Sequence, residues 1–371
     1  MSSSRRPRPA SEAIIAGGVV VVLVALVAAV FLSGAGDTLY PPKAATTQAR
    51  DTRGLYDIVF AISVGIFLIV EALIVWSILR YRRRPEDTEL PAQTHGNNLV
   101  EVIWTLIPTA IVLFLFVVSW RTLNTVDAVS SSPDIRIHAV AGQFQWQFEY
   151  LDRNGTKVAT QTIPAYDATS SPDGGMAVPV GKSVQVTLSS PDVIHAFYVP
   201  RFLFKRDVIP GQTNRFEFTV DPSEAGQVFR GQCAELCGDG HRRMLFNVIA
   251  LDQASYDTWL QNLIARANAT PAPVPSGTSL QLTAKGITYL TTSLETAANA
   301  PFSIVFKNED PAGTVHDVEI RAADGTVIKK QPTTDGGQTS TYVYEALPAG
   351  TYTFICSIHP IPQMTGTLTV K

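Results

Sequence analysis

A short segment in the second half of the chain gathers side chains that bind soft metal ions. Two thiols, an imidazole and a thioether lie close together at Cys233, Cys237, His241 and Met244. A second imidazole, His195, follows a predicted strand about forty residues earlier. Thiolate and thioether ligands together favour copper. The alternative is a structural zinc site on the two cysteines and two histidines, although zinc has little use for the methionine.

A second group of the same kind lies near the C-terminus. Cys356, His359 and Met364 follow a predicted strand, and His316 stands forty residues before the cysteine. Two imidazoles, one thiolate and a more distant methionine are the ligands of a mononuclear blue-copper centre. The alternative is a fibronectin-like sandwich with a stray thiol. The chain has three cysteines, and this odd count argues against a disulfide framework.

Three apolar runs precede these clusters, at residues 14–32, 58–79 and 99–120. Each is about 20 residues long, which is enough to cross a ~30 Å hydrocarbon core as a helix. Arginines at 5–8 and 80–84 predict a cytoplasmic N-terminus and a cytoplasmic loop after the second run. Everything after Trp120 is then outside. The first run is either an uncleaved helix or a signal peptide cleaved after Ala35.

From residue 134 onward the apolar residues alternate with polar ones, which indicates strands with one buried face. The expected strands lie at residues 135–137, 183–187, 215–220, 303–306, 317–320, 351–355 and 365–370. A short amphipathic helix is expected at 254–267, and the Pro-rich composition of residues 268–279 predicts a linker. We therefore expect two antiparallel β-sandwiches in series.

The first metal-binding segment has the pattern Cys-x-Glu-x-Cys-x-x-x-His-x-x-Met. It resembles the loop of subunit II of cytochrome c oxidases that holds the dinuclear mixed-valence copper site CuA, and the resemblance covers roughly residues 50–265. It implies that Cys233 and Cys237 bridge the two coppers. The other implied ligands are His195, His241, Met244 and the backbone carbonyl of Glu235. The Glu235 side chain would also face a magnesium site shared with subunit I.

Two further stretches resemble the same family. Residues 101–108 are similar to the start of its second transmembrane helix, where a glutamate lies at the mouth of a proton pathway. Glu101 is therefore a candidate for proton uptake. Residues 142–150 are similar to an aromatic stretch in which two tryptophans flank one residue. Phe144 stands at the first position, where electrons from cytochrome c usually arrive, and Trp146 stands at the second. This departure puts the usual docking of a basic cytochrome c in doubt.

Residues 279–371 resemble the plastocyanin-like cupredoxins. The resemblance implies His316, Cys356 and His359 as close ligands of a type 1 copper, with Met364 axial. The expected fold class is a transmembrane anchor of two to three helices followed by two all-β, cupredoxin-like Greek-key sandwiches. The expected parts are an N-terminal segment at 1–55, a helical hairpin at 56–122, a CuA domain at 123–267, a linker at 268–279 and a blue-copper domain at 280–371.

These resemblances imply an oxidoreductase component: the electron-accepting subunit of a haem-copper cytochrome c oxidase. Electrons would come from cytochrome c or another small redox protein, directly or through the fused blue-copper domain. They would leave for haem in subunit I, which with a further copper reduces oxygen to water and translocates protons. The alternatives are a CuA subunit of a nitric oxide reductase-type complex, or a C-terminal domain that delivers copper.

The same reading places the protein in a bacterial cell membrane as a multi-pass chain, in contact with lipid and with the other oxidase subunits. Both copper domains would lie on the outer face. The chain is slightly acidic, with a formal net charge of −3, and nothing in it suggests binding to nucleic acid.

Overall fold

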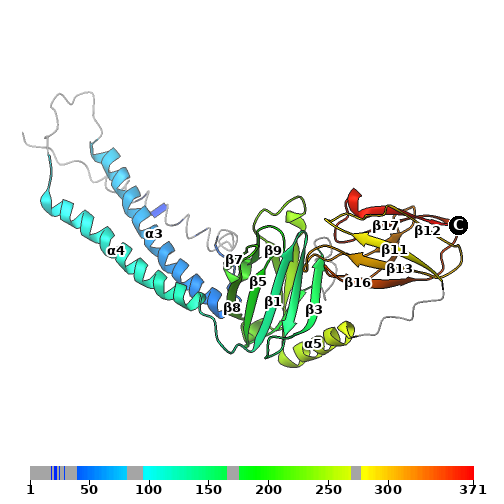
Figure 1. The fold of residues 1–371 in the computed structure, drawn as a ribbon. Helices are drawn as coiled ribbons and strands as arrows, with labels where there is room; N and C mark the ends of the chain where they lie inside the picture. The colour runs from blue at the N-terminus through cyan, green and yellow to red at the C-terminus, as the bar shows by residue number, and fades with distance from the viewer. Residues whose placement is uncertain are drawn as a thin grey trace, which may run out of the picture. The chain divides into compact units, whose positions relative to one another are not determined.

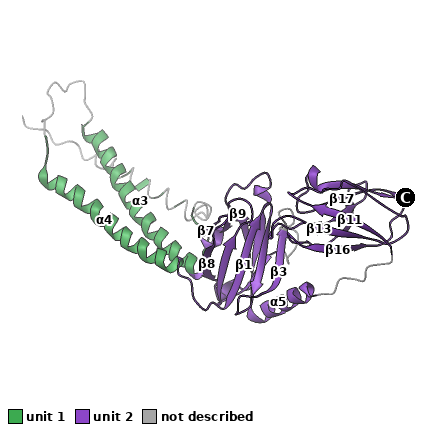
Figure 2. Ribbon diagram, in the orientation of Figure 1, with its two compact units in different colours: residues 1–44, 48–126 green, residues 45–47, 127–371 purple. Residues whose placement is uncertain are grey.

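The computed structural model describes residues 40–81, 95–164, 175–268 and 277–371, together with isolated positions between 18 and 29. The chain divides into two compact units (Figure 2). One comprises residues 1–44 and 48–126, and the other comprises residues 45–47 and 127–371. The described part of the first unit is mainly helical, whereas the second is built mainly of strands (Figure 1).

The first unit contains two long apolar helices, α3 (Thr47–Tyr81) and α4 (Asn98–Val126). Both are long and apolar enough to cross a membrane, and most of their large apolar side chains are exposed. Asn97 caps α4, because its side-chain oxygen accepts the N–H groups of Leu99 and Val100 at 3.1 and 3.3 Å. The second and third apolar runs are thus confirmed as helices, and the first run lies outside the described residues except for isolated positions.

The second unit begins with a sandwich of two five-stranded sheets. One sheet has the order β3-β2-β1-β5-β8, with β1 at Ile135–Gly142, β2 at Gln145–Leu151, β3 at Lys157–Pro164, β5 at Ser183–Ser189 and β8 at Asn214–Thr219. The other has the order β4-β10-β9-β6-β7, with β4 at Gly175–Pro179, β6 at His195–Val199, β7 at Phe204–Val208, β9 at Val228–Cys233 and β10 at Leu245–Leu251.

The core of this sandwich is rich in aromatic rings. Trp146 stacks on Phe148 with ring centroids 6.2 Å apart, and Phe246 packs 4.8 Å from Phe197. The alternating burial of β9 directs every second side chain inward, including the last, Cys233. Helix α5 (Gln253–Ala267) follows β10 and starts at an Asp252 cap, whose carboxylate accepts the Ser255 N–H at 2.9 Å.

A second sandwich with its own core follows. One sheet has the order β11-β13-β16, with β11 at Thr278–Ala284, β13 at Phe302–Asn308 and β16 at Thr339–Tyr344. The other has the order β12-β18-β17-β14-β15, with β12 at Ser293–Thr296, β14 at Glu319–Arg321, β15 at Val327–Lys330, β17 at Gly350–Ile355 and β18 at Thr365–Val370.

The two sandwiches are confirmed, but the expectation that their strands are purely antiparallel is wrong. Strand β1 pairs in parallel with β5, and β4 pairs in parallel with β10. The second sandwich has parallel pairs β11–β13 and β12–β18. Alternation in a sequence indicates which face is buried but not the direction of the neighbouring strand, so the pattern could not reveal these pairs.

The strand expected at residues 317–320 is shorter than the alternation indicated. Strand β14 begins only at Glu319. Asp317 lies before it, and its carboxylate accepts the N–H and the hydroxyl of Ser357 at 2.7 and 2.5 Å. Asp317 is therefore held by side-chain hydrogen bonds to Ser357 and not by strand pairing. The domain boundaries expected from the sequence stay predictions.

Candidate metal centres

The side chains of the first cluster come from neighbouring strands and the loop between them. His195 is the first residue of β6, and Cys233 is the last residue of β9. Cys237 lies in the loop that follows, and His241 begins a short 3-10 helix, η3 (His241–Arg243). Met244 stands directly before β10. Because β9 pairs with β10, Met244 at the end of the loop lies beside Cys233 at its start.

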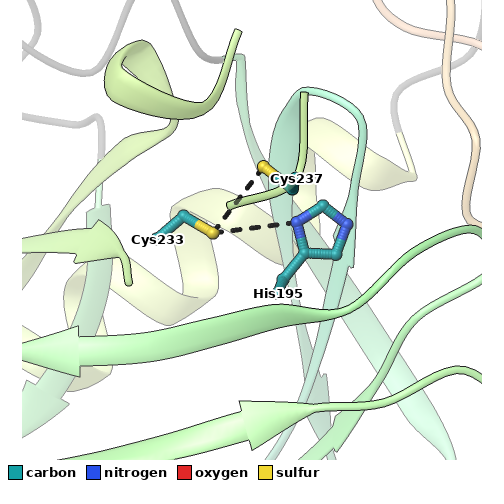
Figure 3. Close-up of side chains that lie close together, drawn as sticks. All are labelled: His195, Cys233 and Cys237. Atoms are coloured by element: carbon teal, nitrogen blue, oxygen red, sulfur yellow. Dashed lines mark hydrogen bonds between the residues drawn. The ribbon is translucent and has the colours of Figure 1, made fainter. Parts of the chain in front are cut away.

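These side chains converge with ligand-like spacings. The Cys233 sulfur lies 3.8 Å from both His195 Nδ1 and the Cys237 sulfur, and Figure 3 shows the three groups pointing toward one another. The Cys237 sulfur lies 3.5 Å from His241 Nδ1 and 3.9 Å from Met244 Sδ. Ligand atoms that share one metal ion lie roughly 3–4 Å apart. Both thiols are free.

The ligand atoms form two groups, one around each thiol, and this distinguishes a pair of copper ions from a single zinc ion. One thiol, Cys233, contacts His195 and the carbonyl of Glu235, the latter at 3.3 Å. The other, Cys237, contacts His241 and the thioether. Structural zinc almost always takes four ligands in a single tetrahedron. Six donor atoms, two of them adjoining thiol sulfurs and one a thioether, fit a pair of copper ions better than one zinc ion.

Asp192 orients the buried imidazole of His195. Its Oδ1 lies 2.8 Å from His195 Nε2, which leaves Nδ1 facing the cysteines. Burial alone would raise the pKa of Asp192, but hydrogen bonds from His195 and from two backbone N–H groups lower the pKa below its usual value. A ligating histidine is commonly held by such a carboxylate. The contact therefore supports a ligand role for His195.

The two thiols of the first cluster are coupled in their ionisation. A hydrogen bond from Cys237 lowers the pKa of Cys233, although burial opposes this. Donation of that same hydrogen bond raises the pKa of Cys237, and burial adds to the effect. The two thiols therefore do not ionise independently, and a nearby cation would favour ionisation of both.

The Glu235 side chain has a protein partner among the described residues. Its Oε2 lies 3.2 Å from Lys205 Nζ, and Lys205 also contacts Asp207 at 2.6 Å. The carboxylate is about half exposed, with 45% of its side-chain surface accessible. The backbone carbonyl therefore belongs to the cluster, whereas the side chain points to a charged surface. A magnesium role for it stays a prediction.

The two aromatic positions of β2 and its preceding turn have different surroundings. Trp146 is fully buried in the core between the sheets. Phe144 is half-buried and packs on the metal-binding loop, since a methyl group at Gly240 would lie 2.4 Å from its ring. The structure therefore places Phe144, and not Trp146, against the loop that carries Cys237.

The second cluster is built on a similar frame. Cys356 directly follows β17, and Met364 ends a short 3-10 helix, η4 (Pro362–Met364), directly before β18. His316 lies between β13 and β14, where a single bridge joins it to Thr334. His359 lies on the loop between the cysteine and the methionine. The side chains of all four predicted ligands are buried.

Three ligand atoms meet in this second cluster. The Cys356 sulfur lies 3.7 Å from Nδ1 of His316 and 3.7 Å from Nδ1 of His359. The two Nδ1 atoms are 3.0 Å apart. Met364 returns to the cysteine through the backbone, because its carbonyl accepts the Cys356 N–H at 3.0 Å. One sulfur and two imidazole nitrogens fit a single copper ion.

The surroundings of the second cluster favour neutral groups. Burial raises the pKa of the Cys356 thiol. Burial, together with the neighbouring His316, lowers the pKa of His359 to about 4. A neutral imidazole is the form that binds a metal ion. Asp310 Oδ2 lies 2.7 Å from His316 Nε2 and fixes that ring, as Asp192 fixes His195.

Sequence reasoning missed both of these carboxylates and one junction residue. Asp192 stands three residues before His195, and Asp310 stands six before His316. A carboxylate shortly before each histidine was the available signal. Gln143 was missed as well, and its side-chain amide donates to the Cys237 carbonyl. No local pattern marks that residue.

Glu101 lies at the start of α4 and is exposed. Its carboxylate accepts the N–H of Asn97 at 3.3 Å, so it takes part in capping the helix. It lines a shallow hollow with Asn98 and Thr105. A role in proton uptake stays a prediction.

Profiles of three protein families match this chain. "Cytochrome C oxidase subunit II, transmembrane domain" matches residues 36–122, and "Cytochrome C oxidase subunit II, periplasmic domain" matches residues 135–251. "Cupredoxin-like domain" matches residues 259–370. The two subunit II profiles describe a protein that is anchored in a membrane and carries a copper domain outside it.

Individual relatives agree with these matches. The chain is 33% identical to "Probable cytochrome c oxidase subunit 2" of Streptomyces coelicolor over 261 residues, which are 62% of this chain and 81% of the relative. It is 30% identical to "Cytochrome c oxidase subunit 2" of Thermostichus vulcanus over 347 residues, 79% of this chain and 97% of the relative. The crystal structure of the periplasmic domain of subunit II of cytochrome oxidase of Bradyrhizobium japonicum is 30% identical, with 37% of this chain and 99% of that chain covered and a TM-score of 0.33.

The fold and the two clusters define a membrane-anchored protein with two copper-binding domains of the cupredoxin type. The relatives are named as subunits of an oxidoreductase complex. The chain belongs to the cytochrome c oxidase subunit II family.

Proposed function

We propose that this chain is the subunit that accepts electrons in a haem-copper oxidase and passes them to haem in subunit I. One observation carries the proposal: His195, Cys233, Cys237 and His241 form a continuous row of ligand atoms with each step between 3.5 and 3.8 Å. Copper bound there supplies one-electron redox chemistry. The residues of the chain would hold the metal and orient its ligands.

Both thiolates, Cys233 and Cys237, would hold the two coppers of the first centre. His195 and His241 would each ligate one copper, and Met244 and the Glu235 carbonyl would complete the set. The buried frame of β6, β9 and β10 supports this role, because a rigid site changes little when its charge changes. Small rearrangement is what an electron carrier requires.

The second centre would take one copper on His316, Cys356 and His359, with Met364 as a further ligand. We propose that it passes electrons to the first centre and so replaces or assists a soluble donor. Burial of all four side chains supports a redox relay over copper delivery, because a delivery site must exchange its metal with a partner. The other partners are a small redox protein as donor and the remaining oxidase subunits.

The membrane arrangement follows from the same assignment. Helices α3 and α4 would anchor the chain in a bacterial cell membrane, with both copper domains on the outer face. Glu101 would admit protons at the cytoplasmic side, and Glu235 would reach a magnesium ion at the contact with subunit I. The oxygen chemistry would reside in subunit I on haem and a further copper.

The direct test is the copper content and electron paramagnetic resonance spectrum of the purified full-length chain. We expect three coppers per chain, with one delocalised mixed-valence signal and one blue-copper signal. Cys233→Ser should remove the first signal alone, and Cys356→Ser should remove the second alone. Zinc in place of the copper pair would contradict the proposal.

The relay is tested in the assembled oxidase. Cys356→Ser should lower steady-state turnover with the natural donor, because it removes the thiolate of the second centre. Gln363→Ala, an exposed position on the same loop, is the matched control and should leave turnover unchanged. Equal turnover of Cys356→Ser and the unmodified oxidase would contradict the relay, and it would not bear on the proposed first centre.

A further inference from the structure

The two sandwiches meet at a contact in which two buried amide N–H₂ groups find a hydrogen-bond acceptor. Gln145 and Gln147 both donate from Nε2 to the carbonyl of Gly313, at 2.8 and 3.2 Å. Both glutamines are buried, with 1% and 2% of their surface exposed. Buried amide donors are almost always hydrogen-bonded, and here a single carbonyl of the second sandwich serves two of them. The contact is therefore a specific one.

The carbonyl of Gly313 is held in place by its own domain. The Gly313 N–H donates to Asp335 Oδ1 at 2.8 Å, and the Thr314 N–H donates to the Pro311 carbonyl at 3.0 Å. Asn308 Nδ2 donates to the Thr314 carbonyl at 2.8 Å. This hydrogen-bonded turn precedes His316 directly in the chain. The contact thus fixes the side of the second sandwich that carries the second cluster.

Small residues allow the two backbones to approach. A methyl group at Gly313 would lie 3.0 Å from Cγ1 of Val140, and a methyl group at Gly142 would lie 3.6 Å from the Gly313 carbonyl oxygen. Gly313 has a φ of 94°, which favours glycine. A larger side chain at Gly313 would therefore both strain the turn and separate the domains.

Gln143 lies beside this contact and reaches both clusters. Its carbonyl accepts the Nε2 hydrogen of His359, whose Nδ1 faces Cys356. Its side-chain amide donates to the carbonyl of Cys237. Its N–H donates at 2.6 Å to Oδ2 of Asp192, the carboxylate that holds His195. Three polar groups of Gln143 are thus hydrogen-bonded to a ligand of the second centre, to a ligand residue of the first centre and to the carboxylate that orients His195.

We propose that Gln143 is a positioning residue that connects the two candidate copper centres, with the Gly313 contact holding the second domain in place for it. The inference rests on the proposed relay and specifies the path of the electron between the two centres. One electron moves from the mononuclear copper, which is oxidised, to the dinuclear centre, which is reduced. It passes by His359, the bonds of Gln143 and the Cys237 backbone. No covalent bond forms or breaks, and no proton is transferred.

The test is electron equilibration within the copper-loaded full-length chain in detergent, started by pulse radiolysis and followed at the absorption bands of both centres. The unmodified chain should show a fast phase in which one centre is oxidised as the other is reduced. Gln143→Leu should lose this fast phase, while both paramagnetic resonance signals and both reduction potentials stay unchanged. The backbone carbonyl to His359 remains in this variant, so the folded contact is retained.

A second variant addresses the contact itself. Gln145→Leu with Gln147→Leu should also lose the fast phase, and it should increase hydrogen exchange in residues 311–316. Gln185→Leu is the matched control, because it removes a bond of the same kind, 2.8 Å from Nε2 to the Ser130 carbonyl, inside the first sandwich. The control should keep the fast phase.

The outcomes separate the route from the relay. An unmodified chain without any equilibration between the centres would overturn the relay and the route together. Fast equilibration that persists unchanged in Gln143→Leu would overturn the role of Gln143 alone. Loss of the fast phase in Gln185→Leu as well would overturn the specificity of the route.

Discussion

The two metal clusters are held by the same strand frame and differ in the loop that the frame supports. In the first sandwich the N–H of Cys233 donates to the carbonyl of Met244 at 2.9 Å. In the second the N–H of Cys356 donates to the carbonyl of Met364 at 3.0 Å. An antiparallel strand pair continues from each bond, β9 with β10 and β17 with β18. Both loops are therefore closed at equivalent points.

The loops themselves differ in length and in content. Ten residues separate Cys233 from Met244, whereas seven separate Cys356 from Met364. The longer loop holds a second thiol, Cys237, 3.8 Å from the first. The shorter loop brings only His359 to its cysteine. Loop length on a common frame thus decides whether a domain offers ligands for one metal ion or for two.

The largest effect should come from exchanging the loops. Replacement of residues 234–243 by residues 357–363 keeps His195, Cys233 and Met244 and supplies one new histidine. Because the frame is equivalent, the first domain should lose one copper per chain and exchange its mixed-valence signal for a second blue-copper signal. Copper analysis and electron paramagnetic resonance measure both changes.

Cys237→Ser is the control for that exchange, since it removes the second thiol at unchanged loop length. It should lose the mixed-valence signal without gaining a well-formed blue-copper signal. A folded loop-exchange variant that binds no copper in its first domain would show that the two frames are not equivalent.

The sequence predicted those parts of the site that lie close together along the chain. Five of the ligands expected in the first centre fall from Cys233 to Met244, and three expected in the second fall from Cys356 to Met364. Strand alternation likewise predicted the buried faces of β5, β8 and β13. Local spacing is what a sequence records directly, so these elements could be read from it.

The parts that the sequence did not predict depend on distant partners. The parallel pairing of β1 with β5 joins strands separated by other elements. Gln143 and His359 are separated by 216 positions, and no periodicity relates them. Asp310 is an ordinary turn residue until the fold brings its carboxylate to His316. Such contacts follow from tertiary packing, which local patterns do not specify.

The second effect concerns a glycine–phenylalanine pair that both frames contain in opposite order. Gly231 pairs with Phe246 across β9 and β10, and Phe354 pairs with Gly366 across β17 and β18. A methyl group would lie 2.3 Å from the Phe246 ring at Gly231 and 2.1 Å from the Phe354 ring at Gly366. Each Gly→Ala variant should destabilise its own domain by about 1–3 kcal/mol through overpacking. Calorimetric unfolding would resolve the two domains.

Gly350→Ala is the matched control for that pair of variants, because the nearest atom to its added methyl group lies at an ordinary 3.6 Å. It should leave the unfolding of the second domain nearly unchanged. Phe354→Leu combined with Gly366→Ala should recover part of the loss, since the two residues are in contact. Equal losses at Gly350 and Gly366 would rule out ring overlap as the cause.

The smallest effect should distinguish the two carboxylates that orient a histidine. In Asp310 and in Asp192 one carboxylate oxygen accepts from the histidine ring and the other accepts a backbone N–H, so the N–H₂ group of Asp310→Asn or Asp192→Asn must face a donor in either orientation. Loss of such an orienting carboxylate typically lowers metal affinity by about 10- to 100-fold. The loss should be greater for Asp310, whose side chain is 5% exposed, than for Asp192, whose side chain is 23% exposed, because hydrogen bonds are stronger away from water. Competition with a copper chelator measures each affinity, and Asp324→Asn and Asp152→Asn, in exposed turns of the two domains, are the controls. A greater loss at Asp192 would mean that the partly exposed first centre depends more on its orienting carboxylate than the buried second centre does.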